Sequence, residues 1–314
     1  MSIYLPIAEM SVNVWVLLAF GGAIGFLSGL FGIGGGFLLT PLLIFLGVPP
    51  AVAAATGANT VIAPSVSGIL SALRRRTIDL KMGAILVVGG LAGSAASVWI
   101  FSLLRRLGQI DLAVSLGYVL LLGTIGGLMF LESVRAMRRR KAAGGTPRGR
   151  LHRHTWIHGL PLKMRFPSSR LYISALVPAG IGFGVGVLSG LMGVGGGFIM
   201  VPAMIYVVGM PTSLVVGTSQ LQIIVVSASV TILQSYANHS VDVLLAAVLI
   251  AGSLVAAPYG VRFGARLRAE QLRILLALLV LAVAGQLAYR LVSVPGDLFS
   301  FEPAAAPVAA VTSE

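Results

Sequence analysis

The sequence predicts an all-α polytopic membrane protein, made of two inverted repeats of five apolar segments that each contain a glycine-broken helical hairpin. The first observation is composition: 57% of the 314 residues are hydrophobic and 10% are charged. A soluble domain carries about 25% charged residues, so this chain has too few to cover a water-exposed surface. The other two observations are a series of ten apolar segments and a ten-residue motif that occurs twice.

Ten apolar segments follow one another along the chain. A membrane-spanning helix needs about 20 apolar residues. Eight segments come close to this length, and 36–48 and 197–209 are clearly shorter. The ten segments lie at 12–31, 36–48, 51–73, 82–104, 111–131, 173–192, 197–209, 212–236, 241–261 and 271–292.

The repeated motif reads SGLFGIGGGF at 28–37 and SGLMGVGGGF at 189–198, with eight of ten positions identical. Further matches keep an offset of 160–163 residues: Pro41 with Pro202, Pro49 with Pro211, Gly57 with Gly217, and Asp79 with Asp242. We interpret this pattern as an internal duplication. It divides the chain into a first membrane repeat (1–131), a basic cytoplasmic linker (132–170), a second membrane repeat (171–293) and a disordered tail (294–314).

The distribution of basic residues predicts how the repeats are oriented. Five segments per repeat is an odd number, so the second repeat enters the membrane from the opposite side. If the linker is inside, the inside loops hold nineteen of the 22 Lys and Arg residues. These loops are 74–81, 132–170, 209–211 and 262–273. Cytoplasmic loops are enriched in Lys and Arg, so we expect inverted repeats with both termini outside, in the inner (plasma) membrane.

Charge and composition also exclude several classes of protein. The net charge of +13 does not indicate a nucleic-acid partner, because the basic residues gather in loops beside apolar segments. The first ten residues contain no Lys or Arg, unlike a signal peptide, and the chain has no cysteine. His152, His154 and His158 in the linker could bind a metal, but no carboxylate or cysteine nearby completes a site. We interpret them as part of a basic loop and expect no cofactor.

The glycine-rich motif predicts a break in each hairpin. Each glycine costs a helix about 1 kcal/mol relative to alanine, so the chain should unwind and restart near Phe37 and near Phe198. The restarted helices present free N–H groups and a partial positive charge, which favour anions. Matched glycine-interrupted segments in two halves indicate a transport site. The expected backbone donors are Gly34, Gly35, Gly36, Gly195, Gly196 and Gly197.

Other interpretations of the glycines are possible. Small residues also let membrane helices pack closely, and Gly25 and Gly29 could have this role alone. A nucleotide-binding loop is excluded because no P-loop lysine follows the motif.

Asn59 and Gln220 each lie about 12 Å past a helix start, at 1.5 Å per residue. They belong to a set of polar residues that follows each broken hairpin: Thr56, Asn59 and Thr60 in the first half, and Thr218, Ser219, Gln220 and Gln222 in the second. They could tie helices together, but their position beside the glycines favours a shared polar cavity. The apolar segments carry essentially no ionisable residue away from their ends. A proton-driven pump or an intramembrane hydrolase needs such groups, so we expect a transporter and not an enzyme.

Taken together, these blocks resemble the sulfite exporter (TauE/SafE) family of anion transporters. The resemblance covers GLFGIGGGFLLTPLL and GLMGVGGGFIMVPAM, the ATGANT and VGTSQ blocks that follow them, and Asp79 and Asp242. It departs from the family pattern at Ala58 and Asn59, where Thr and Ser are common. The resemblance implies export of a small anion, such as sulfite or sulfoacetate. A carrier of another small solute or a cation, and a membrane scaffold or anchor subunit without transport, stay open as alternatives.

Overall fold

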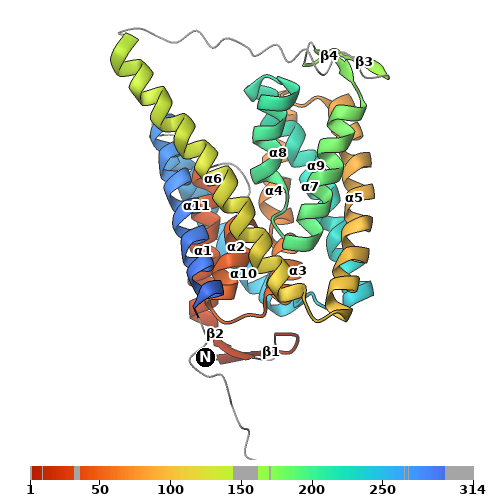
Figure 1. The fold of residues 1–314 in the computed structure, drawn as a ribbon, viewed down its shortest axis with the longest axis vertical. Coiled ribbons are helices and arrows are strands. Elements are labelled where there is room, and N and C mark those ends of the chain that lie inside the picture. Colours follow the sequence, from red (N-terminus) through yellow and green to blue (C-terminus); the bar gives the residue numbers. More distant parts are fainter. Residues whose placement is uncertain are drawn as a thin grey trace, which may run out of the picture.

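The computed structural model describes residues 2–8, 10–31, 36–143, 162–169, 171–264, 266–267 and 269–293. The first half contains α1 (Val14–Phe31), α2 (Gly36–Phe45), α3 (Pro50–Thr60), α4 (Ile62–Arg74), α5 (Leu80–Arg106) and α6 (Ile110–Ala143). The second half contains α7 (Leu176–Met192), α8 (Gly197–Ala203), the π-helix η2 (Met204–Val208), α9 (Thr212–Asn238), α10 (Val243–Gly264) and α11 (Ala269–Val292). The helices form one bundle (Figure 1).

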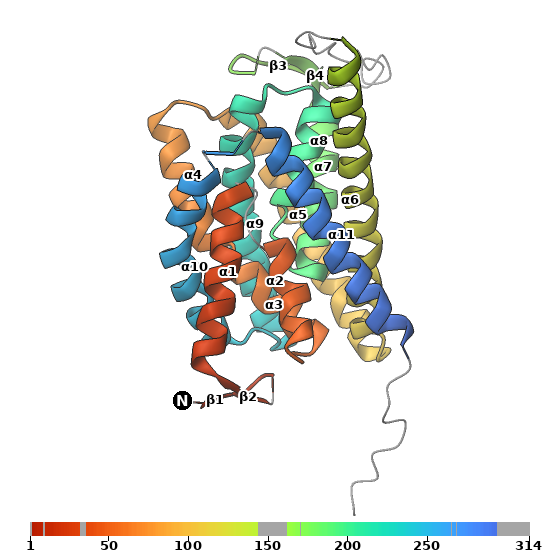
Figure 2. The same ribbon diagram turned by 90° about the vertical axis from the view of Figure 1, so that its left-hand side faces the viewer.

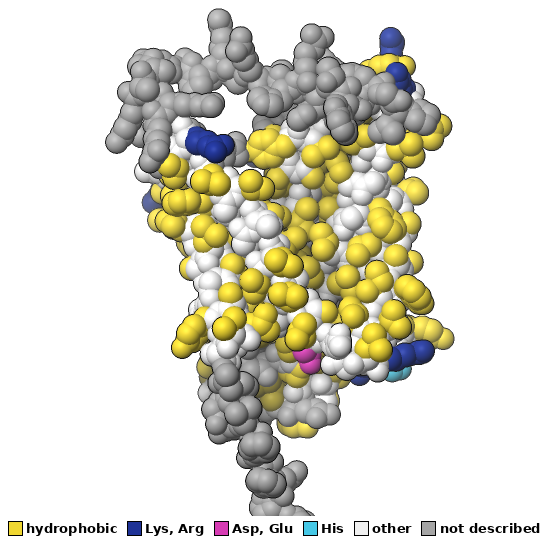
Figure 3. Space-filling model, viewed as in Figure 1, with side chains coloured by type: hydrophobic (Ala, Val, Ile, Leu, Met, Phe, Trp, Pro, Cys, Tyr) yellow, Lys and Arg dark blue, Asp and Glu magenta, His cyan; other side chains and the backbone are white. Residues whose placement is uncertain are grey.

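The prediction of a polytopic membrane protein is confirmed. Within the described ranges, seven helical segments are long and apolar enough to cross a membrane, with α3 and α4 counted together as one. Helix α7 has 17 residues, about 26 Å at 1.5 Å per residue, and so is slightly short. On the face drawn in Figure 3, charged side chains lie toward the two ends, with many hydrophobic side chains between them. The histidines of the linker and the tail 294–314 lie outside the described residues.

Two short β hairpins were not predicted. Strands β1 (Ser2–Leu5) and β2 (Met10–Asn13) pair antiparallel, as do β3 (Lys163–Phe166) and β4 (Leu171–Ser174). The two hairpins are offset by 161 residues throughout, so each is part of the duplicated unit, and β3 lies within the segment assigned to the linker. They lie at opposite ends of the bundle in both ribbon views (Figures 1 and 2).

The segment 51–73, predicted as one span, is divided into α3 and α4 at Val61. The physical reason is Pro64, which has no N–H to donate to the Thr60 carbonyl four residues earlier. In α9 the equivalent position is Val226, and that helix is continuous. The two halves therefore differ at the same point of an otherwise shared plan.

Each restarted helix contains a proline in its second turn. Pro41 and Pro202 are each the sixth residue of their helix. Each therefore removes the helical hydrogen bond to the carbonyl of Phe37 or Phe198. Helix α8 soon changes into a π-helix, the kind of irregularity that accompanies kinks in membrane helices.

Glycines hold two helix pairs together at backbone contact. A Cβ built at Gly21 of α1 would lie 2.6 Å from the Leu249 carbonyl oxygen of α10. At Gly182 of α7 it would lie 2.4 Å from the Leu86 carbonyl oxygen of α5. Such clearances leave no room for a side chain, so close packing is an established role of the glycines in α1 and α7.

Two buried aspartates connect the halves reciprocally. Asp79 caps α5, and its N–H donates to the Thr218 hydroxyl at 3.0 Å. Asp242 precedes α10, and its N–H donates to the Thr56 hydroxyl at 3.1 Å. The side chain of each aspartate is 1% exposed.

Both aspartates also hold a hairpin turn. Oδ2 of Asp79 accepts from the N–H and hydroxyl of Ser169, at 3.1 and 2.5 Å. Oδ2 of Asp242 accepts from the N–H of Ile7 at 3.3 Å. Each hairpin is therefore fixed to the start of a helix from the other half of the chain.

Candidate functional site

The helix breaks occur where the glycines predicted them. Helix α7 ends at Gly193 in the left-handed conformation, Gly195 and Gly196 also have positive φ, and α8 begins at Gly197. Helix α2 begins at Gly36. Gly34 and Gly35 lie outside the described residues.

The start of α2 meets the second break inside the bundle. A Cβ at Gly36 would lie 2.7 Å from the Val194 carbonyl oxygen and 2.4 Å from the Val61 side chain. A Cβ at Gly195 would also meet Val61, at 2.7 Å. Beside them, the equivalent rings of Phe37 and Phe198 stack with centroids 4.4 Å apart. The first residue of α2, the second break and the α3–α4 break therefore share one small region.

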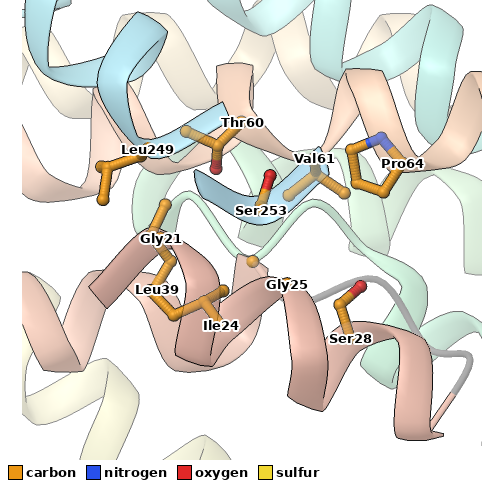
Figure 4. Close-up of a pocket in the computed structure, with 11 residues that line it drawn as sticks. Gly21, Ile24, Gly25, Ser28, Leu39, Thr60, Val61, Pro64, Leu249 and Ser253 are labelled. Carbon is orange, nitrogen blue, oxygen red and sulfur yellow. The ribbon is translucent and has the colours of Figure 1, made fainter. Parts of the chain in front are cut away.

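A pocket lies beside the start of α2 (Figure 4). Its free volume of about 10 Å³ is enough for roughly one water molecule. The residues that line it come from α1, α2, the α3–α4 break and α10: Gly21, Ile24, Gly25, Ser28, Gly36, Leu39, Thr60, Val61, Pro64, Leu249 and Ser253. In Figure 4 the hydroxyls of Thr60 and Ser253 face the gap between these helices. None of the lining side chains is ionisable.

The pocket contains two of the predicted site residues, Gly36 and Thr60. The Thr60 hydroxyl donates to the Gly57 carbonyl at 2.8 Å within its own helix. The Ser253 hydroxyl likewise donates to Ile250 at 2.9 Å. Because hydroxyls rotate, each of these groups has one donor that can turn to a ligand.

The hydroxyls of Thr56 and Thr218 accept the aspartate N–H groups described above, away from this pocket. This pairing makes Thr56 the counterpart of Thr218, so Gly57 corresponds to Ser219 and not to Gly217 as aligned from the sequence. The Ser219 hydroxyl donates to the Val216 carbonyl at 3.0 Å.

The remaining predicted site residues lie outside the pocket, where other helices pack together. The Gln220 amide packs against Gly68 of α4, where an added Cβ would lie 2.5 Å from its Oε1. Gln222 is completely buried between α9 and α5. Asn59 is half-buried. The predicted site residues therefore lie at several different helix–helix contacts.

Several pocket residues were missed by sequence reasoning. Ser28 opens the repeated motif, so the duplication itself pointed to it, and Pro64 was visible as a helix breaker. Ser253 carried no comparable signal. Tyr118 was also missed: it is fully buried, and its hydroxyl donates to the Met192 carbonyl at 2.5 Å, which fixes the end of α7 next to the break.

Comparison with known proteins identifies the class. The sulfite exporter TauE/SafE family matches residues 17–287, and the chain belongs to this family. It is therefore a membrane transporter and not an enzyme.

Individual relatives agree with this class. The chain is 30% identical over 275 residues to a probable membrane transporter protein, YjnA, of Bacillus subtilis, covering 87% of this chain and 97% of the relative. It is 26% identical over 285 residues to YunE of the same organism, with coverage of 87% and 97%. A probable membrane transporter protein of Xylella fastidiosa (strain 9a5c) is 30% identical over 278 residues, 86% of this chain and 92% of the relative. No solved structure matches the chain.

Proposed function

We propose that the protein exports a small anion, sulfite or an organosulfonate such as sulfoacetate, across the inner membrane as a uniporter or secondary transporter. The observation that carries the proposal is the pocket at the first residue of α2. Free N–H groups and the partial positive charge of the helix start favour an anion there. The hydroxyls of Thr60 and Ser253 add rotatable donors, and no lining side chain is ionisable.

The pocket is too narrow for sulfite, because its volume of about 10 Å³ suits one water. We propose that α3 and α4 separate at Val61 when the anion binds, since Pro64 has already removed a hydrogen bond there. Backbone N–H groups of residues 34–36 and 195–197 then surround the anion, because Gly36 lies against Val194 of the second break.

The inverted-repeat arrangement is part of the proposal. Residues 1–131 and 163–293 are the two repeats, because the β3–β4 hairpin matches β1–β2, and 132–162 is the cytoplasmic linker. Support comes from the hairpins at opposite ends of the bundle and from the reciprocal bonds of Asp79 and Asp242. Repeats related in this way let a transporter open to either side around one central site.

Reporter fusions test this topology. A fusion at Gly145 should report the cytoplasm, and one after Pro303 should report the outside, because nineteen of the 22 Lys and Arg residues lie on the linker side. Alkaline phosphatase and green fluorescent protein fusions are active on opposite sides and check each other. Both positions reporting one side would contradict the inverted repeats.

Thr60→Val tests the site. The change removes the hydroxyl and keeps the side-chain shape, and a hydrogen bond to a charged group contributes about 1.5–3 kcal/mol. We expect sulfite flux into proteoliposomes at limiting sulfite to fall roughly 10-fold or more.

Thr124→Val is the matched control. Thr124 also donates to a carbonyl of its own helix, at 2.7 Å, but it is exposed on α6, outside the pocket. Its flux should stay at the wild-type level. If both variants retained full sulfite flux, the pocket would not be the substrate site.

A further inference from the structure

The pocket beside α2 has a counterpart in the second half. A Cβ at Gly25 would lie 2.4 Å from the Ser253 backbone, and one at Gly186 would lie 2.3 Å from the Gly90 carbonyl oxygen. The contacts of Gly21 with Leu249 and of Gly182 with Leu86, described above, correspond to each other in the same way. Together with the Thr56–Thr218 pairing, these contacts match the residues of the two halves one by one: Gly21 with Gly182, Gly25 with Gly186, Ser28 with Ser189, Thr60 with Gln222, Leu249 with Leu86, and Ser253 with Gly90.

The counterpart space holds the Gln222 side chain. A Cβ at Gly90, the position of Ser253 in the first half, would lie 2.9 Å from Nε2 of Gln222 and 2.4 Å from the Val226 side chain. The same point is 3.6 Å from the Gly182 carbonyl oxygen. The carboxamide therefore lies between α5, α7 and α9, where the first half has the shorter Thr60 and an open pocket.

The polar groups here lack hydrogen-bond partners. Gln222 is 0% exposed, and neither Nε2 nor Oε1 has a partner among the described residues. Ser189, 1% exposed, lies between Gly186 and Gly190, which both contact α5, and its hydroxyl is also without a partner. Burying an unpaired amide or hydroxyl costs about 1–3 kcal/mol, so such groups need a specific explanation.

We propose that Gln222 and Ser189 form a second oxyanion-binding station, the counterpart of the Thr60 pocket. This proposal rests on anion transport as the function of the protein. It adds a residue, Gln222, whose side chain selects oxyanions. Gln222 of α9 and Ser189 of α7 occupy the positions of Thr60 and Ser28, which line one pocket in the first half. On that correspondence, the two N–H donors of the carboxamide and the Ser189 hydroxyl bond two oxygens of one sulfite or sulfonate group. The anion then has one station in each half of the chain.

Gln222→Met tests the station, because it keeps the length of the side chain and removes its hydrogen-bonding groups. With purified full-length protein and sulfite as the probe, we expect binding measured by calorimetry to weaken roughly 10- to 100-fold. The sulfite-free variant should unfold at the wild-type temperature or above it, because an unpaired buried amide has been removed.

Gln234→Met is the matched control on the same helix. The Gln234 amide is fully buried too, but it is paired: Nε2 donates to the Gly190 carbonyl at 2.9 Å, and Oε1 accepts from Asn238 at 2.6 Å. This variant should unfold at a lower temperature, and its folded fraction should bind sulfite as the wild type does.

Two results would overturn the station while anion transport stands. One is a Gln222→Met protein that binds sulfite as tightly as the wild type, which would mean that the amide meets only water. The other is a thermal destabilisation equal to that of Gln234→Met, which would indicate a structural role. Failure of the wild-type protein itself to bind or carry sulfite or sulfoacetate would instead overturn the proposed function.

Discussion

Gly193→Ala is expected to lower both the unfolding temperature and the yield of folded protein sharply. Gly193 has φ +69°, a conformation that costs an L-residue roughly 1–2 kcal/mol. The new Cβ would also lie 1.9 Å from the Ala54 carbonyl oxygen of α3, a contact with backbone that cannot rotate away. Overpacking of this kind costs about 1–3 kcal/mol or more, and whole domains are stable by only about 5–15 kcal/mol. Yield of monodisperse protein and thermal unfolding in detergent measure the effect.

Gly209→Ala separates the cost of the left-handed conformation from the cost of the contact with α3. Gly209 also ends a helix in the left-handed conformation, at φ +74°, but no heavy atom lies within 4 Å of an added Cβ. This variant should lose only about 1–2 kcal/mol and still purify normally. Equal losses in the two variants would show that the contact of Gly193 with α3 contributes nothing.

The contact between Gly193 and α3 matters for the site as well as for the fold. The Gly193 contact places the second break against α3, six residues before Thr60. The Tyr118 hydroxyl holds the adjacent Met192 carbonyl. These contacts keep the breaks, the start of α2 and the pocket together.

The breaks and the membrane class could be predicted because they depend on composition and local conformation. Clustered glycines disfavour a helix wherever they occur, and long apolar segments need a bilayer. The β hairpins could not be predicted, because the residue pattern of a four-residue strand such as β1 is too short to distinguish the strand from a polar loop. The division at Val61 was predictable in principle from Pro64.

The site was harder to predict, because it depends on which helices touch. Thr56 and Thr218 follow the glycine-rich motifs along the chain, but their hydroxyls accept from the N–H groups of Asp242 and Asp79, respectively, each from the other half. Ser253 enters the pocket because Gly25 lets α10 approach α1 at backbone distance. Spacing along one helix carries no information about such a neighbour.

The two buried aspartates are relevant to the driving force of anion transport. Within the described part of the chain, Asp79 and Asp242 are the buried carboxylates, each at the start of a helix. Oδ1 of each accepts a backbone N–H of that helix, and Oδ2 accepts from a hairpin turn. Groups held in this way anchor the structure, and they are poorly placed to carry protons along a pathway. We therefore propose an uncoupled or weakly coupled anion flow.

Anion flux is expected to follow the membrane voltage. A negative cell interior drives each exported negative charge outward by about 2.3 kcal/mol per 100 mV. At 1.4 kcal/mol per factor of ten, this term alone favours export roughly 40-fold. Proteoliposomes loaded with sulfite, with a potassium–valinomycin potential and no pH gradient, measure the effect. Efflux should rise steeply as the interior becomes negative.

The pH gradient provides the opposing experiment. Since no ionisable side chain lines the pocket, a gradient without voltage should change the flux little once the ionisation of sulfite is allowed for. A fully ionised sulfonate such as sulfoacetate removes that complication, because its sulfonate charge does not change near neutral pH. Flux that ignores voltage but follows pH would contradict uncoupled flow. His239, exposed in the left-handed conformation at the end of α9, would then be the first side chain to replace.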